Sequence, residues 1–298
     1  MPSIRFAITA AALTPDPRLA ATRSRELGFA GLQFDAYGPS LRLPELSISG
    51  QREFRHMLDA QNQQLVGLRA DLGPKGFGPG SDVDRLLHGL TRAIETAAAL
   101  RAPLVCIDLG PLPEPQAVAM PSPRIDPAKA GLLLLPEPAA TAPPPVSPPP
   151  DPAFVALIDA ALGALGEIAD RYSALLAFRT DLASFAALNA ALHRSACPWF
   201  GIDLDPVAML RDEWPDDEIF SRLGAKIRHV RGRDAVAGAQ RRTQSAIVGR
   251  GDTQWPALLA NLDAAGFNGW LTLDPVDMVD RPAAARDGSH YLKKQIEP

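Results

Sequence analysis

Cysteine and uncompensated positive charge are both scarce in this sequence. Its 298 residues include only two cysteines, Cys106 and Cys197, far apart and in apolar surroundings. Such spacing predicts buried thiols in a reducing compartment and excludes a disulfide framework. The 30 basic residues are outnumbered by 34 acidic ones. Because nucleic-acid binding needs clustered uncompensated Lys and Arg, we expect no nucleic-acid partner.

Long hydrophobic runs and an N-terminal targeting segment are also missing. No apolar run approaches the ~18 residues that span a bilayer, and Met1 leads directly into a strand-like segment at residues 4–8. We therefore expect a cytoplasmic protein that does not insert into a membrane. Hydrophobic residues make up 46% of the chain, enough for one folded core, so residues 1–298 are predicted to form a single domain. The sequence indicates no oligomeric state.

Short β-rich runs alternate with longer stretches of helical period. Val83, Leu86, Leu90, Ile94 and Ala97, for example, recur at spacings of mostly three and four residues and predict an amphipathic helix. This alternation is typical of βα units around a parallel sheet, and eight strands indicate a closed (β/α)8 TIM barrel of the α/β class. The expected strands cover residues 4–9, 31–35, 65–71, 104–109, 175–180, 200–205, 227–233 and 270–274.

A proline-rich insertion interrupts this rhythm after the fourth strand. Residues 111–152 hold 15 of the 30 prolines, which prevents a continuous helix or sheet. In a barrel the insertion would emerge at the carboxyl face, where active sites are built. We expect residues 132–135 to pack on the body and 141–150 to form a polyproline II linker. A surface excursion is favoured over a functional lid, and the lid stays open as the alternative.

Polar residues end most of the predicted strands. Side chains two residues apart on a strand face the same way, so these groups are expected to converge on the barrel mouth. They are Gln33, Asp35, Arg69, Asp71, Asp108, Arg179, Asp181, Asp203, Asp205, His229, Arg231, Arg233 and Asp274. Whether His229 reaches the mouth or stays in an interior layer depends on the strand register.

Four segments near the carboxyl end carry distinctive motifs. Residues 202–206 (Ile-Asp-Leu-Asp-Pro) end a strand in Asp-Pro, and residues 227–234 form the seventh predicted strand. Residues 249–256 follow a Gly-x-Gly-x-x-x-Trp pattern that leads into the last helix but one, and residues 269–274 form the final strand. In order and spacing these segments resemble the xylose isomerase-like TIM barrel family of sugar phosphate isomerases and epimerases. Independently, Asp252 is predicted as the N-cap of that helix and Pro256 as a first-turn residue.

The resemblance implies a site for one or two divalent metals, with a Glu from strand five, an Asp from strand six, a His from strand seven and a Glu from strand eight. The matching positions here are Arg179, Asp205, Arg231 and Asp274. A guanidinium has no lone pair to offer, so it cannot be a ligand. We therefore predict no metal and no other cofactor. An endonuclease-like role, known in this superfamily, is disfavoured because its multi-histidine cluster has no counterpart.

Two hypotheses follow. In the first, the barrel binds a small polyol-like or anionic molecule without the metal, and any remaining catalysis uses Asp205 or Asp274 as the base. The residues expected to bind that ligand are Arg69, Asp71, Asp108, Arg179, His229, Arg231 and Arg233. In the second, the same residues form a salt-bridge network that closes a retired active site, and the protein acts as a scaffold whose proline-rich loop contacts a partner.

Overall fold

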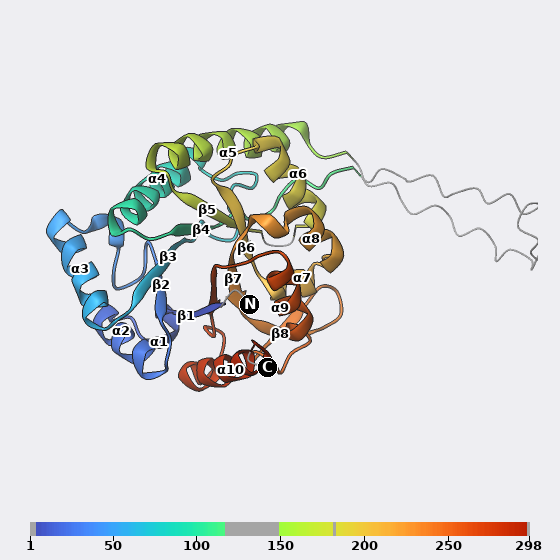
Figure 1. The fold of residues 1–298 in the computed structure, drawn as a ribbon. Helices are drawn as coiled ribbons and strands as arrows, with labels where there is room; N and C mark the ends of the chain where they lie inside the picture. Colours follow the sequence, from blue (N-terminus) through green and yellow to red (C-terminus); the bar gives the residue numbers. More distant parts are fainter. Residues whose placement is uncertain (1–3, 117–148, 181–182, 297–298) are drawn as a thin grey trace, which may run out of the picture.

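The computed structural model describes residues 4–116, 149–180 and 183–296, and its centre is a closed barrel of eight parallel strands (Figure 1). Around the barrel the order is β1, β2, β3, β4, β5, β6, β7 and β10. The strands are β1 (Arg5–Thr9), β2 (Gly31–Asp35), β3 (Gln64–Ala70), β4 (Leu104–Asp108), β5 (Leu175–Arg179), β6 (Phe200–Leu204), β7 (Ile227–Gly232) and β10 (Trp270–Leu273). The predicted TIM barrel is confirmed, and every strand agrees with its predicted range to within one residue at each end.

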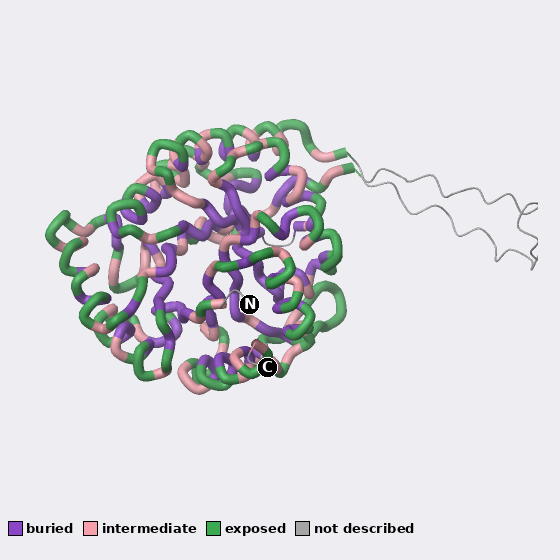
Figure 2. Tube along the Cα trace, viewed as in Figure 1, coloured by how far each residue is buried: buried purple, intermediate pink, exposed green. Residues whose placement is uncertain are grey.

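Helices surround the barrel (Figure 1). They are α1 (Ala10–Leu13), α2 (Pro17–Glu26), α3 (Ile48–Ala60), α4 (Val83–Leu100), α5 (Pro152–Tyr172), α6 (Phe185–Ser195), α7 (Pro206–Arg211), α8 (Asp216–Leu223), α9 (Trp255–Ala264) and α10 (Arg281–Ile296), with short 3₁₀ turns at Leu43–Glu45 and Gly224–Lys226. Buried residues line the strands and the inner helix faces, while the outer helix faces are exposed (Figure 2). The main hydrophobic core therefore lies between the strands and the helices.

The barrel interior is filled by side chains on the opposite strand faces. Outside the main core, two smaller buried clusters form, one of Ala7, Val66 and Trp270, and one around Cys106. Because side chains alternate along a strand, these clusters occupy the inner face of the barrel. The barrel is thus packed below its mouth, and a ligand could reach it only from the carboxyl ends of the strands.

Helix α5 is the one described helix that is long and apolar enough, by length and composition, to cross a membrane. Asp159 and Glu167 lie within it, so it is not an uninterrupted apolar run. Its buried residues, such as Leu162 and Leu165, repeat along one face, and it packs between α4 and α6. The helix therefore belongs to the helical layer around the barrel, like its neighbours.

A two-stranded hairpin that was not predicted follows β7. It pairs β8 (Asp234–Ala237) with β9 (Thr243–Ala246) in antiparallel register. Its second strand, Thr-Gln-Ser-Ala, lacks the apolar alternation that would have revealed it. The Asp252 carboxylate accepts a hydrogen bond from the Ala237 backbone N–H (2.7 Å), and α9 begins only at Trp255. The predicted N-cap role of Asp252 is therefore wrong, whereas Pro256 does lie in the first turn.

Asp234 anchors the loop that leads into α9. Its buried carboxylate accepts hydrogen bonds from the backbone N–H groups of Gly249 (2.8 Å), Gly251 (3.2 Å) and Thr253 (3.2 Å), and from the indole of Trp255 (3.1 Å). A Cβ at Gly251 would lie 2.3 Å from an oxygen of this carboxylate. The Gly-Arg-Gly sequence is therefore needed for the loop to close around Asp234.

The proline-rich segment lies between β4 and α5. Residues 117–148 within it fall outside the described residues. The expected packing of residues 132–135 and the linker at 141–150 thus stay predictions, as does the treatment of 111–152 as an insertion in one domain.

Candidate functional site

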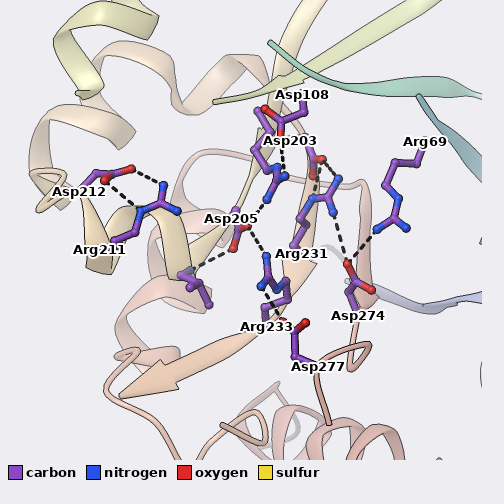
Figure 3. A network of polar contacts seen from close by, with 12 residues as sticks. Arg69, Asp108, Asp203, Asp205, Arg211, Asp212, Arg231, Arg233, Asp274 and Asp277 are labelled. Atoms are coloured by element: carbon purple, nitrogen blue, oxygen red, sulfur yellow. Dashed lines mark hydrogen bonds and ion pairs between the residues drawn. The ribbon is translucent and has the colours of Figure 1, made fainter. Parts of the chain in front are cut away.

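Arginine and aspartate side chains from most of the barrel strands meet at the mouth (Figure 3). The strands bring them together because each residue lies at or just beyond a carboxyl strand end and on the inner face. The contributing residues are Arg69 on β3, Asp108 on β4, Arg179 on β5, Asp203 on β6, Asp205 after β6, Arg231 on β7, Arg233 after β7 and Asp274 after β10.

Arg231 joins two buried carboxylates at the centre of the mouth. Its Nε and Nη2 lie 2.8 and 2.7 Å from Asp203 Oδ2, and its Nη1 lies 3.3 Å from Asp274 Oδ2. Arg231 is only 4% exposed, and the two aspartates are 1% and 5% exposed. Figure 3 shows its guanidinium between them. These contacts occupy much of the Arg231 guanidinium.

Asp274 connects Arg231 to Arg69 on β3, so the ion pairs continue across the mouth. Its Oδ2 also accepts from Arg69 Nη1 (3.3 Å), and its Oδ1 accepts from the Thr9 hydroxyl (3.0 Å). Arg69 in turn donates to Asp35 Oδ1 through Nε (2.6 Å). Asp274 is thus fully engaged by protein groups, and Arg69 and Asp35 form the partly exposed end of the chain.

A second chain of ion pairs is centred on Asp205. Its Oδ2 accepts from Arg179 Nη1 and Arg233 Nη1, each at 3.1 Å, and its Oδ1 accepts from the backbone N–H that begins α7 (3.1 Å). Arg179 also pairs with Asp108, and Arg233 with Asp277 (3.0 Å). Within the described ranges, Arg179 Nε is buried and has no hydrogen-bond partner.

These contacts set the protonation states of the mouth. Burial alone would raise the pKa of Asp205, but Arg233 and Arg179 outweigh it and hold that pKa below its usual value. Burial likewise acts on Asp203, where Arg231 and His229 hold the pKa far below its ordinary range. The Arg231 pKa is raised, since Asp203 and Asp274 outweigh the effect of burial. Asp203 and Asp205 are therefore ionised at neutral pH, and their carboxylates are weak bases.

The network has no surplus of positive charge. Four guanidinium groups face six carboxylates within it. They are Arg69, Arg179, Arg231 and Arg233 against Asp35, Asp108, Asp203, Asp205, Asp274 and Asp277. An anion entering the mouth would meet more negative than positive groups.

His229 lies one interior layer below Arg231. It is fully buried, with Nδ1 2.6 Å from Asp203 Oδ1 and Nε2 2.7 Å from the Thr272 hydroxyl. An ionised carboxylate only accepts, so Nδ1 carries the proton. Both ring nitrogens are hydrogen-bonded to protein groups. Of the two positions left open by the sequence, His229 thus has the one in an interior layer, and it does not face an incoming ligand.

Cys106, Asp203 and His229 form a group whose ligand atoms lie within 4.8 Å of one another. Burial, reinforced by Asp203, raises the pKa of the Cys106 thiol well above its usual value. The Gln33 amide donates to its sulfur at 3.2 Å. With Asp203 neutralised by Arg231, this group is better described as a hydrogen-bonded interior layer than as a metal centre.

Asp71 is the predicted site residue that the structure places away from the network. It is exposed, and its carboxylate accepts from the backbone N–H of Gly73 at 2.8 Å. Strand β3 ends at Ala70. Asp71 follows this last strand residue, so the side-chain alternation that directs Arg69 into the mouth does not extend to it. Asp181, also named at a strand end, lies outside the described residues.

Two members of the network, Thr9 and Asp277, were not predicted from the sequence. Asp203 was expected at the mouth but was not named as a base or a ligand-binding residue; it lies two residues before Asp205 on the same strand face. Thr9 ends β1 without a charge to mark it, and Asp277 lies in the loop after β10. Only contacts in space identify these last two.

Comparison with known proteins places the chain in context. A family model described as xylose isomerase-like TIM barrel matches residues 21–295. No curated protein matches the sequence. Among solved structures, a xylose isomerase domain protein from Planctomyces limnophilus superposes with a TM-score of 0.73 at 16% identity, covering 98% of this chain and 96% of that one.

Two sugar epimerases have the same fold. The 3-keto-D-glucoside 4-epimerase YcjR from E. coli superposes with a TM-score of 0.66 at 15% identity, covering 98% of this chain and 100% of its own. A D-psicose 3-epimerase gives 0.68 at 13% identity, covering 99% and 100%. At these identities the likeness shows the fold alone.

Proposed function

Because this chain belongs to the xylose isomerase-like TIM barrel family, we propose that its mouth binds a small polyol-like molecule without the divalent metal of that family and without proton-transfer chemistry. One observation carries the proposal: Arg179 is ion-paired with Asp205, and Arg231 with Asp274. The sequence resemblance matches these four residues to the four metal-ligand positions of the family.

The residues present do not fit a divalent metal. A cation at Asp205 and Asp274 would approach two guanidinium groups that already donate to these carboxylates at 3.1 and 3.3 Å. Arginine stays protonated at any accessible pH and offers no lone pair. The two arginines supply the neutralising charge that buried carboxylates require, so these carboxylates do not need a metal ion for charge balance.

A neutral ligand suits the charges of the mouth better than an anion does. Arg231 is buried and engaged, so it is not free to grip an anionic group. The upper groups are partly exposed and alternate in sign: the side chains of Arg179 and Asp108 are 22% and 18% exposed, and those of Arg69 and Asp35 24% and 25%. Hydroxyl groups both donate and accept hydrogen bonds, so a polyol can bind these neighbouring arginine donors and aspartate acceptors.

Proton transfer by either candidate base is disfavoured. Asp205 has a lowered pKa, which makes its carboxylate a weak base. Both Asp274 oxygens already accept hydrogen bonds from Thr9, Arg69 and Arg231. The sugar epimerases that share the fold support a sugar-like ligand, while these contacts argue for binding rather than isomerisation.

Titration calorimetry with neutral sugars and polyols, sugar acids and phosphate tests this proposal. We expect saturable binding of at least one neutral sugar or polyol, weakened by Asp108→Asn, because Asp108 is a partly exposed acceptor at the mouth. Asp159→Asn is the matched control, since Asp159 forms an exposed ion pair with Arg194 on α6, outside the mouth network.

Binding of no neutral compound, or equal weakening by both substitutions, would leave the scaffold hypothesis as the better account. Binding of a sugar acid that depends on Arg231 would show that the mouth is a cationic site instead. Turnover of a bound sugar would contradict the absence of proton-transfer chemistry.

A further inference from the structure

An open surface pocket lies between the loop after β2, the end of β3 and helix α4. Its volume is about 300 Å³, which is in the range of small-molecule pockets. Asp71, which does not join the mouth network, lines this cavity, as do Arg42, Arg85, His88 and Arg92. We refer to it as the α4 pocket.

One wall of the α4 pocket is a cationic face of helix α4. Arg85, His88 and Arg92 are separated by three and four residues, so they share one face of the helix. All three line the cavity. Their donor groups are therefore directed from a rigid element toward the same space.

The opposite wall is held against α4 by specific contacts. The Tyr37 hydroxyl donates to the Gly89 carbonyl of α4 (2.8 Å), and the Arg92 guanidinium donates to the Pro44 carbonyl. Arg42 lies over the Tyr37 ring at 4.9 Å and pairs with Glu45 through Nε at 2.6 Å. These contacts tie the loop to the helix on both sides of the cavity, so the pocket is preformed.

The pocket has unused donors and little negative charge to balance them. Within residues 4–116, 149–180 and 183–296, the side chains of Arg85 and His88 have no hydrogen-bond or ion-pair partner. Asp71 is the acidic residue lining the cavity, and it already accepts from Gly73. The helix start is capped by the Asp82 carboxylate, so the positive character comes from side chains and not from the helix terminus.

We propose that the α4 pocket binds the phosphate group of a small phosphate monoester, with Arg85, His88 and Arg92 as the donors. Guanidinium forks match the geometry of phosphate oxygens and hold them through two parallel hydrogen bonds. This site is separate from the mouth, so its occupancy does not depend on the function proposed there.

Calorimetric titration of inorganic phosphate and glycerol 3-phosphate at low salt tests the assignment. We expect both to bind saturably to the full chain, and Arg85→Gln to weaken binding about tenfold or more, which corresponds to the loss of about 1.4 kcal/mol. Arg52→Gln is the matched control, because Arg52 is exposed on the neighbouring helix α3, lies outside the pocket and carries the same charge. It should bind like the unaltered chain.

Arg85 is exposed, and in the part of the chain that the structure describes its side chain makes no hydrogen bond or ion pair that Gln would remove, so the variant should keep its denaturation midpoint. Three results would overturn the proposal: no saturable phosphate binding to the unaltered chain, equal weakening by Arg85→Gln and Arg52→Gln, or binding that survives Arg85→Gln but is lost in Arg233→Gln. The last result would place the phosphate in the mouth.

Discussion

Replacing Arg231 by Met is the sharpest perturbation of the mouth network. Met keeps much of the volume of the side chain but removes every donor. Asp203 would then keep its contacts with His229 and Cys106 but no cationic arginine, and Asp274 would keep Arg69 and Thr9. Both carboxylates are nearly inaccessible to water, at 1% and 5% exposure, so solvent cannot replace the lost partner.

Removing one partner of a buried ion pair costs about 3–5 kcal/mol, because the remaining charge stays buried. We expect a loss of that size for Arg231→Met. Arg179→Met should cost less, about 1–3 kcal/mol, since Asp205 keeps Arg233 and its backbone donor while Asp108 is partly exposed. Arg194→Met, which breaks the exposed pair with Asp159, should cost less than about 1 kcal/mol.

Urea unfolding at neutral pH measures this order directly. The predicted ranking of the loss in unfolding free energy is Arg231→Met above Arg179→Met above Arg194→Met. If Arg231→Met were neutral or stabilising, Arg231 and Arg179 would be repelling cations awaiting an anion, and the neutralisation argument would fail. Repeating the titrations with phosphate and sugar acids separates the two cases, because only an anion-binding mouth would be stabilised by these compounds.

Three further predictions concern other parts of the chain. Asp203 and Asp205 have lowered folded pKa values, so their stabilisation is complete above the unfolded value of about 3.9 and lost as the pH falls through the folded values. Acid unfolding should therefore begin only below about pH 4, and its onset should move upward in Arg231→Met; an unchanged onset would contradict the pairing. Deleting residues 139–150 should leave the barrel folded, because shortening a proline-rich loop changes its closure entropy only modestly; a fall in thermal midpoint as large as that of a core truncation would show that the segment is structural. Cys106, buried and with a raised pKa, should resist thiol reagents until the protein unfolds, and rapid labelling of the folded chain at this residue would contradict its place in the barrel interior.

The fold could be predicted because short apolar runs and polar strand ends mark each barrel strand. The hairpin of β8 and β9 could not, because both strands are only four residues long and β9 has no apolar alternation. Helix α5 shows the converse difficulty. Its composition alone fits a membrane segment, and only its packing between α4 and α6 shows that it covers the barrel.

The site could be predicted only as far as strand alternation reaches. Alternation correctly places Arg231 and His229 on one face, but two residues span about 6.6 Å along a strand, so His229 lies a layer deeper. Asp71 follows the last residue of β3, where the backbone leaves the sheet and alternation ends. The partners of each arginine depend on side-chain reach across the barrel, which explains why the pairing of Arg231 with Asp203 was not foreseen.

The metal content of the protein tests the central claim most directly. Elemental analysis after incubation with Mn²⁺, Zn²⁺ or Mg²⁺ and desalting should find no stoichiometric divalent metal in the unaltered chain, because Arg179 and Arg231 are ion-paired with Asp205 and Asp274 and neutralise them. About one tightly bound metal per chain, lost on Asp205→Asn or Asp274→Asn, would contradict the claim that these arginines replace the metal.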